Sequence, residues 1–186
     1  MMTFSQTGRT LPEAKQTSLG LYVTAKEAYD MWQADPEKVK ILDVRTPEEY
    51  VFIGHPDMCV NIPLMFPKYE WHEDRQRYSV ELYADFVAVA QELFTSDDTI
   101  LAMCRSGGRG AMAVNMLAKA GFKNVYNIID GMEGDKVNDP ESAYQGKRMR
   151  NGWKNAGLPW TYDLDPELIW HPPEDRLDEI RVALDL

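Results

Sequence analysis

One stretch of the chain, residues 99–121, constrains the fold more than any other. Residues 99–103 form a short apolar run after polar residues 96–98, which predicts a buried parallel strand. A loop with three glycines follows at residues 104–110. Residues 111–120 then carry apolar side chains at helical spacing, and Gly121 supplies a helix stop. The stretch therefore predicts a strand that enters a helix through a tight, glycine-rich loop.

The remaining elements alternate in the same way along the chain. Thr24 opens a capping-box pattern that predicts a helix through Trp32 or Ala34, and Thr46 followed by Pro47 predicts a short second helix. Strands at residues 39–44, 60–62 and 125–128 and a long helix at residues 80–94 complete the expected set. This alternation predicts an α/β fold with a central parallel sheet of about five strands and helices on both faces.

A length of 186 residues suits one domain with extensions. We expect a flexible N-terminal segment at residues 1–20, a domain at residues 21–160 and a C-terminal extension at residues 161–186. The extension carries an acidic helical pattern, with apolar residues between Leu177 and Leu184. We expect it to dock on the domain; dimerisation and partner binding are the alternatives.

Residues 65–79 are aromatic, charged and too polar for a core element. One interpretation is a lid over the glycine-rich loop, with Trp71 or Tyr69 touching a substrate. The other is a surface insertion whose aromatic side chains pack on the domain. The sequence leaves both open.

Cys104 is the candidate reactive group, because it lies where the expected strand meets the loop. Arg105 and Arg109 are in the same loop, and the positive end of a helix dipole follows. Helix N-termini and nearby cations stabilise a thiolate, which is the reactive form of cysteine. We expect Cys104 to be mostly ionised at neutral pH, with an accessible sulfur and the loop amides pointing at it. Cys59 lies in an apolar context and reads as a small buried hydrophobe.

Asp43 falls at the end of its expected strand, on the same edge of the sheet as Cys104. We expect a structural role for this carboxylate, either accepting loop N–H groups or pairing with an arginine. Arg45 and Glu49 are four residues apart and could pair on the short helix.

These residues together resemble the rhodanese-like sulfurtransferases. The resemblance covers roughly residues 24–160, and the matching segments in order are residues 41–50, 54–55, 61–63, 104–110, 121–126, 130–132 and 152–160. It implies a rhodanese-like three-layer fold. One departure is Gly110, where many sulfurtransferases carry alanine or a small polar residue after the loop arginine.

The resemblance also implies a mechanism and a set of site residues. Cys104 would be the catalytic residue, taking a sulfane sulfur from thiosulfate or a similar persulfide donor and passing it to cyanide or a thiol. No general base, metal or other cofactor is implied. The backbone amides and arginines that would bind the substrate belong to Arg105, Ser106, Gly107, Gly108, Arg109 and Gly110.

Two alternatives to a sulfurtransferase remain. A non-catalytic rhodanese-like module could bind partners or sense redox state through the same thiol. Related phosphatases use a loop with five residues between cysteine and arginine, whereas Cys104 and Arg109 are separated by four. The shorter loop shrinks the anion site toward a single sulfur atom, so a phosphatase is the less favoured reading.

Composition narrows the partners and the compartment. With 20 Lys and Arg against 30 Asp and Glu, the formal net charge is −10, which argues against nucleic-acid binding. No acidic residue falls between Asp98 and Asp130, so a small anionic sulfur donor could still be attracted locally. We see neither a signal peptide nor a membrane span, and we expect a cytoplasmic protein whose acceptor is cyanide, a thiol or another protein.

Overall fold

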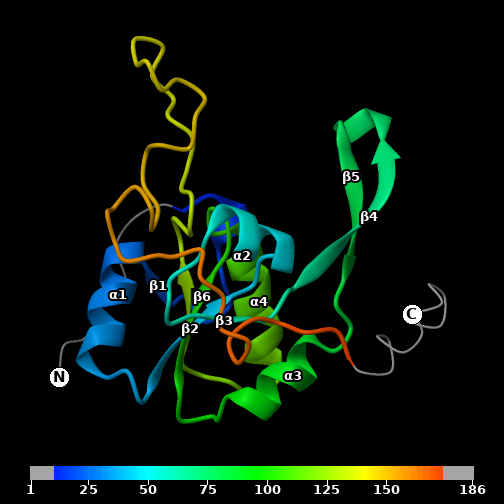
Figure 1. Cartoon of the computed structure of the whole chain (residues 1–186), viewed down its shortest axis with the longest axis vertical. Coiled ribbons are helices and arrows are strands. Elements are labelled where there is room, and N and C mark those ends of the chain that lie inside the picture. Colours follow the sequence, from blue (N-terminus) through cyan, green and yellow to red (C-terminus); the bar gives the residue numbers. More distant parts are fainter. Residues whose placement is uncertain (1–10, 174–186) are drawn as a thin grey trace.

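The computed structural model describes residues 11–173 and has a central five-stranded sheet (Figure 1). Its spatial order is β1-β7-β6-β2-β3, and every pair is parallel, which confirms the α/β prediction. The strands are β1 (Tyr22–Val23), β2 (Val39–Asp43), β3 (Val60–Asn61), β6 (Thr99–Met103) and β7 (Val125–Ile128).

Four helices cover the two faces of this sheet: α1 (Ala25–Ala34), α2 (Pro47–Ile53), α3 (Phe86–Leu93) and α4 (Gly108–Lys119). Alternate residues of β6 point to opposite faces, as the twofold period of a strand requires. Ile100 and Ala102 belong to a core cluster with α3 and α4, whereas Leu101 and Met103 belong to a cluster with α1 and the buried Tyr50 of α2. The sheet is therefore the middle of three layers.

The expected starts of α1 and α2 are confirmed. Thr24 and Thr46 each accept a backbone N–H three residues on, and the glutamates at those positions complete two capping boxes. Helix α4 begins at Gly108, three residues before the expected start, so the end of the glycine-rich loop belongs to its first turn.

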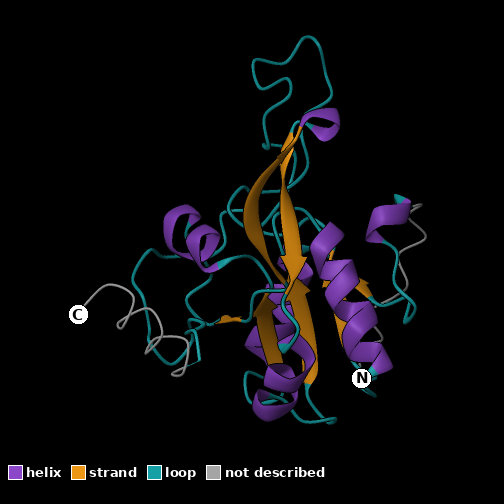
Figure 2. Cartoon of the chain, turned by 90° about the vertical axis from the view of Figure 1, so that its right-hand side faces the viewer, coloured by secondary structure: helices purple, strands orange, loops and turns teal. Residues whose placement is uncertain are grey.

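The expected long helix at residues 80–94 is wrong. Only α3 is helical there, and residues 80–82 lie in β5 (Arg77–Leu82), which pairs antiparallel with β4 (Met65–His72). Val80 and Leu82 alternate with polar residues, which is a strand pattern. The β4–β5 hairpin projects from the domain as a long arm (Figures 1 and 2).

Both ends of the described chain contact the domain. Lys15 donates to the backbone oxygen of Ile129 at 2.7 Å and to Asp135 at 2.8 Å. Toward the other end, Thr161 exchanges two backbone hydrogen bonds with His55, and the ring of Trp170 lies 5.0 Å from that of Phe66. The acidic helical pattern between Leu177 and Leu184 lies outside the described residues.

Candidate active site

The site forms where β6 ends. Cys104 follows the last residue of the strand, and Gly107 is the N-cap of α4. The backbone N–H of Gly107 donates to Sγ of Cys104 at 3.2 Å. The sulfur therefore lies at the positive end of a twelve-residue helix with one amide aimed at it.

Glycine is required at position 107. Its φ is +95°, a conformation that side chains rarely adopt, and an added Cβ would run into the backbone oxygen of Ile129. The segment after β7 closes on the loop from the same side, because the N–H of Met132 donates to the oxygen of Cys104 at 2.8 Å. The loop is thus fixed by contacts with residues 129–132, which its own sequence does not reveal.

The two cysteines are both buried, and the expectation of an accessible sulfur at Cys104 is not met. Cys104 is 2% exposed and Cys59 is fully buried. Burial raises the pKa of the Cys59 thiol well above its ordinary value, and the negative charge of Asp43 adds to the effect. This confirms the interpretation of Cys59 as a small buried hydrophobe. Cys104 differs from it in accepting a hydrogen bond from the Gly107 amide.

Asp43 pairs with Arg45, which is one of the two roles expected for this carboxylate. Nη2 and Nε of Arg45 donate to Asp43 at 2.5 and 2.9 Å, and both side chains are fully buried. Nη2 also donates to the backbone oxygen of Gly54 at 2.9 Å. Burial alone would lower the pKa of Arg45, but the charge and hydrogen bonds of Asp43 and smaller charge contributions raise it.

The expected pairing of the Arg45 and Glu49 side chains is wrong, because each has another partner. Glu49 accepts two hydrogen bonds from Arg109, at 2.5 and 2.6 Å, and these join α2 to α4. Burial alone would raise the pKa of Glu49, but the hydrogen bonds and charge of Arg109, with smaller contributions, hold it below its usual value. Much of the charge of Arg109 is therefore already compensated.

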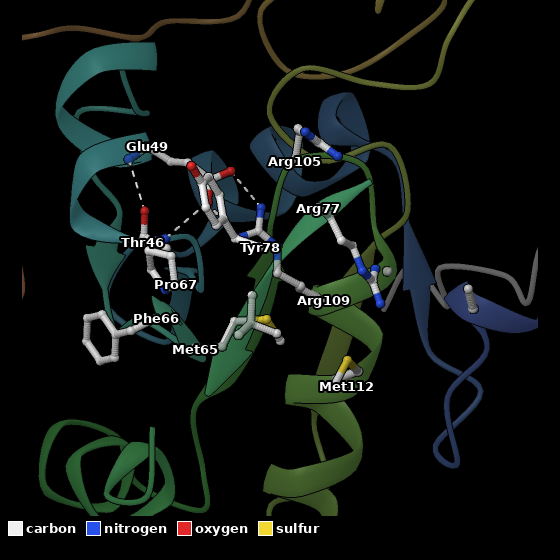
Figure 3. A pocket seen from close by; sticks show the side chains of 13 residues that line it. Thr46, Glu49, Met65, Phe66, Pro67, Arg77, Tyr78, Arg105, Arg109 and Met112 are labelled. Carbon is white, nitrogen blue, oxygen red and sulfur yellow. Dashed lines mark hydrogen bonds and ion pairs between the residues drawn. The ribbon is translucent and has the colours of Figure 1, made fainter. Parts of the chain in front are cut away.

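A cavity of about 740 Å³ lies over the loop (Figure 3). Arg105, Gly108 and Arg109 line it from the loop side, whereas Cys104 and Ser106 are not among the lining residues. The opposite wall is the β4–β5 hairpin, which contributes Met65, Phe66, Pro67, Arg77, Tyr78 and Val80.

Residues 65–79 thus belong to a hairpin arm that borders the cavity, but Tyr69 and Trp71 do not line it. Their rings instead contact Tyr78 edge to face, with centroids 5.9 and 5.4 Å away. The aromatic residues of this arm that line the cavity are Phe66 and Tyr78, and Tyr78 follows an arginine that the sequence analysis did not consider.

A family model described as a rhodanese-like domain matches residues 24–137 of this chain. The chain belongs to the rhodanese-like family. The match includes β2, the Cys104 loop and all of α4, so the site described above lies within it. At the level of the family, this supports a sulfurtransferase-type enzyme.

Individual relatives agree with the assignment. The chain is 31% identical to Thiosulfate sulfurtransferase 16, chloroplastic, of Arabidopsis thaliana, over 63% of this chain and 88% of the relative. It is 28% identical to the Uncharacterized protein RP600 homolog of Rickettsia rickettsii, over 75% of this chain and 96% of that protein. The crystal structure of Rv0390 from M. tuberculosis superposes with a TM-score of 0.57 at 27% sequence identity, over 76% of this chain and 96% of that one.

The departure from the rhodanese-like pattern at Gly110 has a structural reason. A Cβ at this buried position would lie 2.5 Å from Oδ1 of Asn127 and 3.1 Å from the oxygen of Ala102. Nδ2 of Asn127 donates to the oxygen of Gly107 at 3.0 Å and to that of Lys15 at 3.1 Å. Asn127 therefore ties β7 to the N-cap of α4, and Gly110 leaves the space for it. The sequence analysis missed this residue, which has no local motif.

No helix within residues 11–173 combines the length and the apolar character that crossing a bilayer would take.

Proposed function

We propose that this protein is a sulfurtransferase that carries sulfur as a persulfide on Cys104. The observation that supports this most directly is the hydrogen bond from the Gly107 amide to Sγ, at the N-terminus of α4 in a rhodanese-like fold. An amide and a helix dipole directed at sulfur favour the anionic forms that the reaction uses. The related sulfurtransferase of Arabidopsis thaliana adds support for the reaction class.

The first half-reaction loads the sulfur. The Cys104 thiolate attacks the outer sulfur of thiosulfate, the bond between that sulfur and the sulfonate group breaks, and sulfite leaves with the electron pair. In the second half-reaction, cyanide or a thiolate attacks the outer sulfur of the persulfide, and Cys104 leaves as the thiolate. No redox partner is needed in either step, and the Gly107 amide at the positive end of α4 stabilises the negative charge on sulfur.

The burial of Cys104 sets a condition on this mechanism. Because Cys104 is 2% exposed and does not line the cavity, exchange requires a shift of the loop or a persulfide whose outer sulfur extends toward the cavity. The outer sulfur lies about 2 Å beyond Sγ, which is one S–S bond length. A reducing cytoplasm is the compartment in which we expect such a thiol to work.

The same burial favours a second candidate, a rhodanese-like module that binds a partner or senses redox state without turnover. A cysteine that is 2% exposed meets small molecules less readily than one in an open cleft. Such a module would retain the fold and the loop but would not cycle sulfur.

Incubation with thiosulfate followed by intact-protein mass spectrometry separates the two candidates. The sulfurtransferase gains the mass of one sulfur atom, located on Cys104, and loses it when cyanide is added. Cys104→Ser should show neither step, whereas Cys59→Ala should load and discharge like the parent, because Cys59 belongs to a different core cluster from Cys104. A parent protein that takes up no sulfur from thiosulfate or from a low-molecular-weight persulfide would contradict the proposal.

A further inference from the structure

The cavity over the loop is much larger than an inorganic sulfur donor requires. Its volume of about 740 Å³ falls within the range of roughly 300–1,000 Å³ that is typical of sites for organic ligands. Thiosulfate and cyanide would each occupy only a small part of it. The size therefore points to an organic molecule as one of the two substrates.

The lining of the cavity combines an apolar surface with an excess of positive charge. The apolar side chains that line it include Met65, Phe66, Pro67, Val80 and Met112. Three arginines line it against a single acidic residue, Glu49. Figure 3 shows the guanidinium group of Arg77 beside the N-terminal end of α4 and those of Arg105 and Arg109 higher in the view, with Met65 and Met112 nearer the bottom.

The three arginines differ in what they already bind. Arg109 is held by both carboxylate oxygens of Glu49. Within residues 11–173, the side chains of Arg77 and Arg105 form no ion pair and no hydrogen bond. Arg105 belongs to the same loop as Cys104 and follows it directly in the sequence. Arg77 comes from β5, on the opposite wall, so its guanidinium is available to bind an anionic group of a substrate in the cavity.

We infer that the acceptor is an organic thiol with an apolar carbon body and an anionic end group, and that Arg77 binds that end group. The inference rests on the proposed function. The thiolate of the acceptor attacks the outer sulfur of the Cys104 persulfide, a new S–S bond forms on the acceptor, and the old one breaks with its electrons on Sγ of Cys104. Arg77 acts as a specificity-determining residue, because a guanidinium binds a carboxylate or sulfonate in a fixed geometry.

A pair of probes that differ only in their end group tests this assignment. Protein loaded with sulfur from thiosulfate is separated from the donor and discharged with 6-mercaptohexanoate or with 6-mercaptohexanol, and discharge is followed by mass spectrometry. The parent should prefer the carboxylate. Arg77→Gln should reduce the ratio of the two second-order rate constants about tenfold, the loss expected for one charge-assisted hydrogen bond. Arg77→Glu should shift the preference toward 6-aminohexane-1-thiol.

Arg75→Gln is the matched control. Arg75 is also exposed and lies in the turn of the same hairpin, but it does not line the cavity. Its loss changes the net charge equally and should leave the ratio unchanged.

The outcomes distinguish a failure of this inference from a failure of the proposed function on which it rests. If Cys104 takes up no sulfur, the proposed function fails and the inference with it. If sulfur is loaded and discharged but Arg77→Gln leaves the ratio as it is in Arg75→Gln, only the inference is overturned. It is also overturned if Arg77→Gln slows loading from thiosulfate without changing the ratio, since Arg77 would then bind the donor.

Discussion

The two walls of the cavity are built in opposite ways. The loop wall, residues 104–110, is fixed by contacts with the rest of the domain: Gly107 abuts Ile129, Gly110 abuts Asn127 and Arg109 is paired with Glu49. The hairpin wall, formed by β4 and β5, is largely exposed, and a two-stranded hairpin on its own is marginally stable in water. We therefore expect changes in the loop wall to decide whether sulfur transfer occurs, and changes in the hairpin wall to decide which substrate is used.

The largest effect should come from the loop wall, with Gly107→Ala. The new Cβ has to occupy positive φ and collides with the backbone of Ile129, which cannot move independently of β7. Positive φ alone costs about 1–3 kcal/mol for a residue other than glycine. We expect a loss of unfolding free energy above that range, measured by urea denaturation, and loss of sulfur loading on Cys104.

Gly121→Ala isolates the contribution of the collision. Gly121 has a φ of +102°, close to the +95° of Gly107, but an added Cβ there has nothing within 4 Å. This variant should lose only the unfolding free energy that a positive φ costs a residue other than glycine, and it should load sulfur normally. Equal losses of stability in the two variants, with loading retained in both, would show that the loop wall is less tightly held than its contacts indicate.

The sequence predicts the loop wall far better than the hairpin wall, and the reason is the range of the interactions. β6 and β7 match their expected bounds because an apolar run bounded by polar residues is a local signal. The helical interpretation of residues 80–94 failed because β5 depends on pairing with β4. The alternation of Val80 and Leu82 with polar residues is too short to identify a strand before that partner is known.

The ion pairs show the same limit. Spacing along α2 suggested Arg45 as a partner of Glu49, whereas the actual partner, Arg109, is sixty residues away on α4. The burial of Cys104 was missed too, because a loop composition does not reveal that residues 129–132 close over it. The identity of the reactive cysteine could be predicted from the sequence, but its access and the substrate wall opposite could not.

An intermediate effect should follow from Glu49→Gln, which keeps the side chain's size but removes its charge. In the folded protein the pKa of Glu49 lies below its ordinary value of 4.5, so the stabilisation is present above that value and is lost as the pH falls through the lowered pKa. The parent should lose about 1 kcal/mol of unfolding free energy over this acidic range that the variant does not lose, measured by urea denaturation across pH.

The same variant should change how the loop wall binds anions. Without Glu49 the charge of Arg109 is uncompensated at the cavity, so the KM for thiosulfate should fall by about twofold to fivefold, within the range of a partly exposed charge interaction. Glu48→Gln is the control, because Glu48 is exposed on the same turn of α2 and does not line this cavity. Equal changes in both variants would assign the effect to net charge and not to Arg109.

The smallest effect should come from Trp71→Ala on the hairpin wall. Trp71 is 48% exposed and lies outside the cavity, with its ring against Tyr78. An edge-to-face pair contributes about 0.5–1.5 kcal/mol beyond its buried area, and less is expected on an exposed arm. We expect the acceptor KM to change by less than about threefold, whereas Tyr78→Ala, which removes a lining side chain, should change it more. Steady-state assays with 6-mercaptohexanol compare the two variants. If Trp71→Ala raises KM as much as Tyr78→Ala does, then Trp71 touches the acceptor and the hairpin closes over the cavity further than its position in this structure.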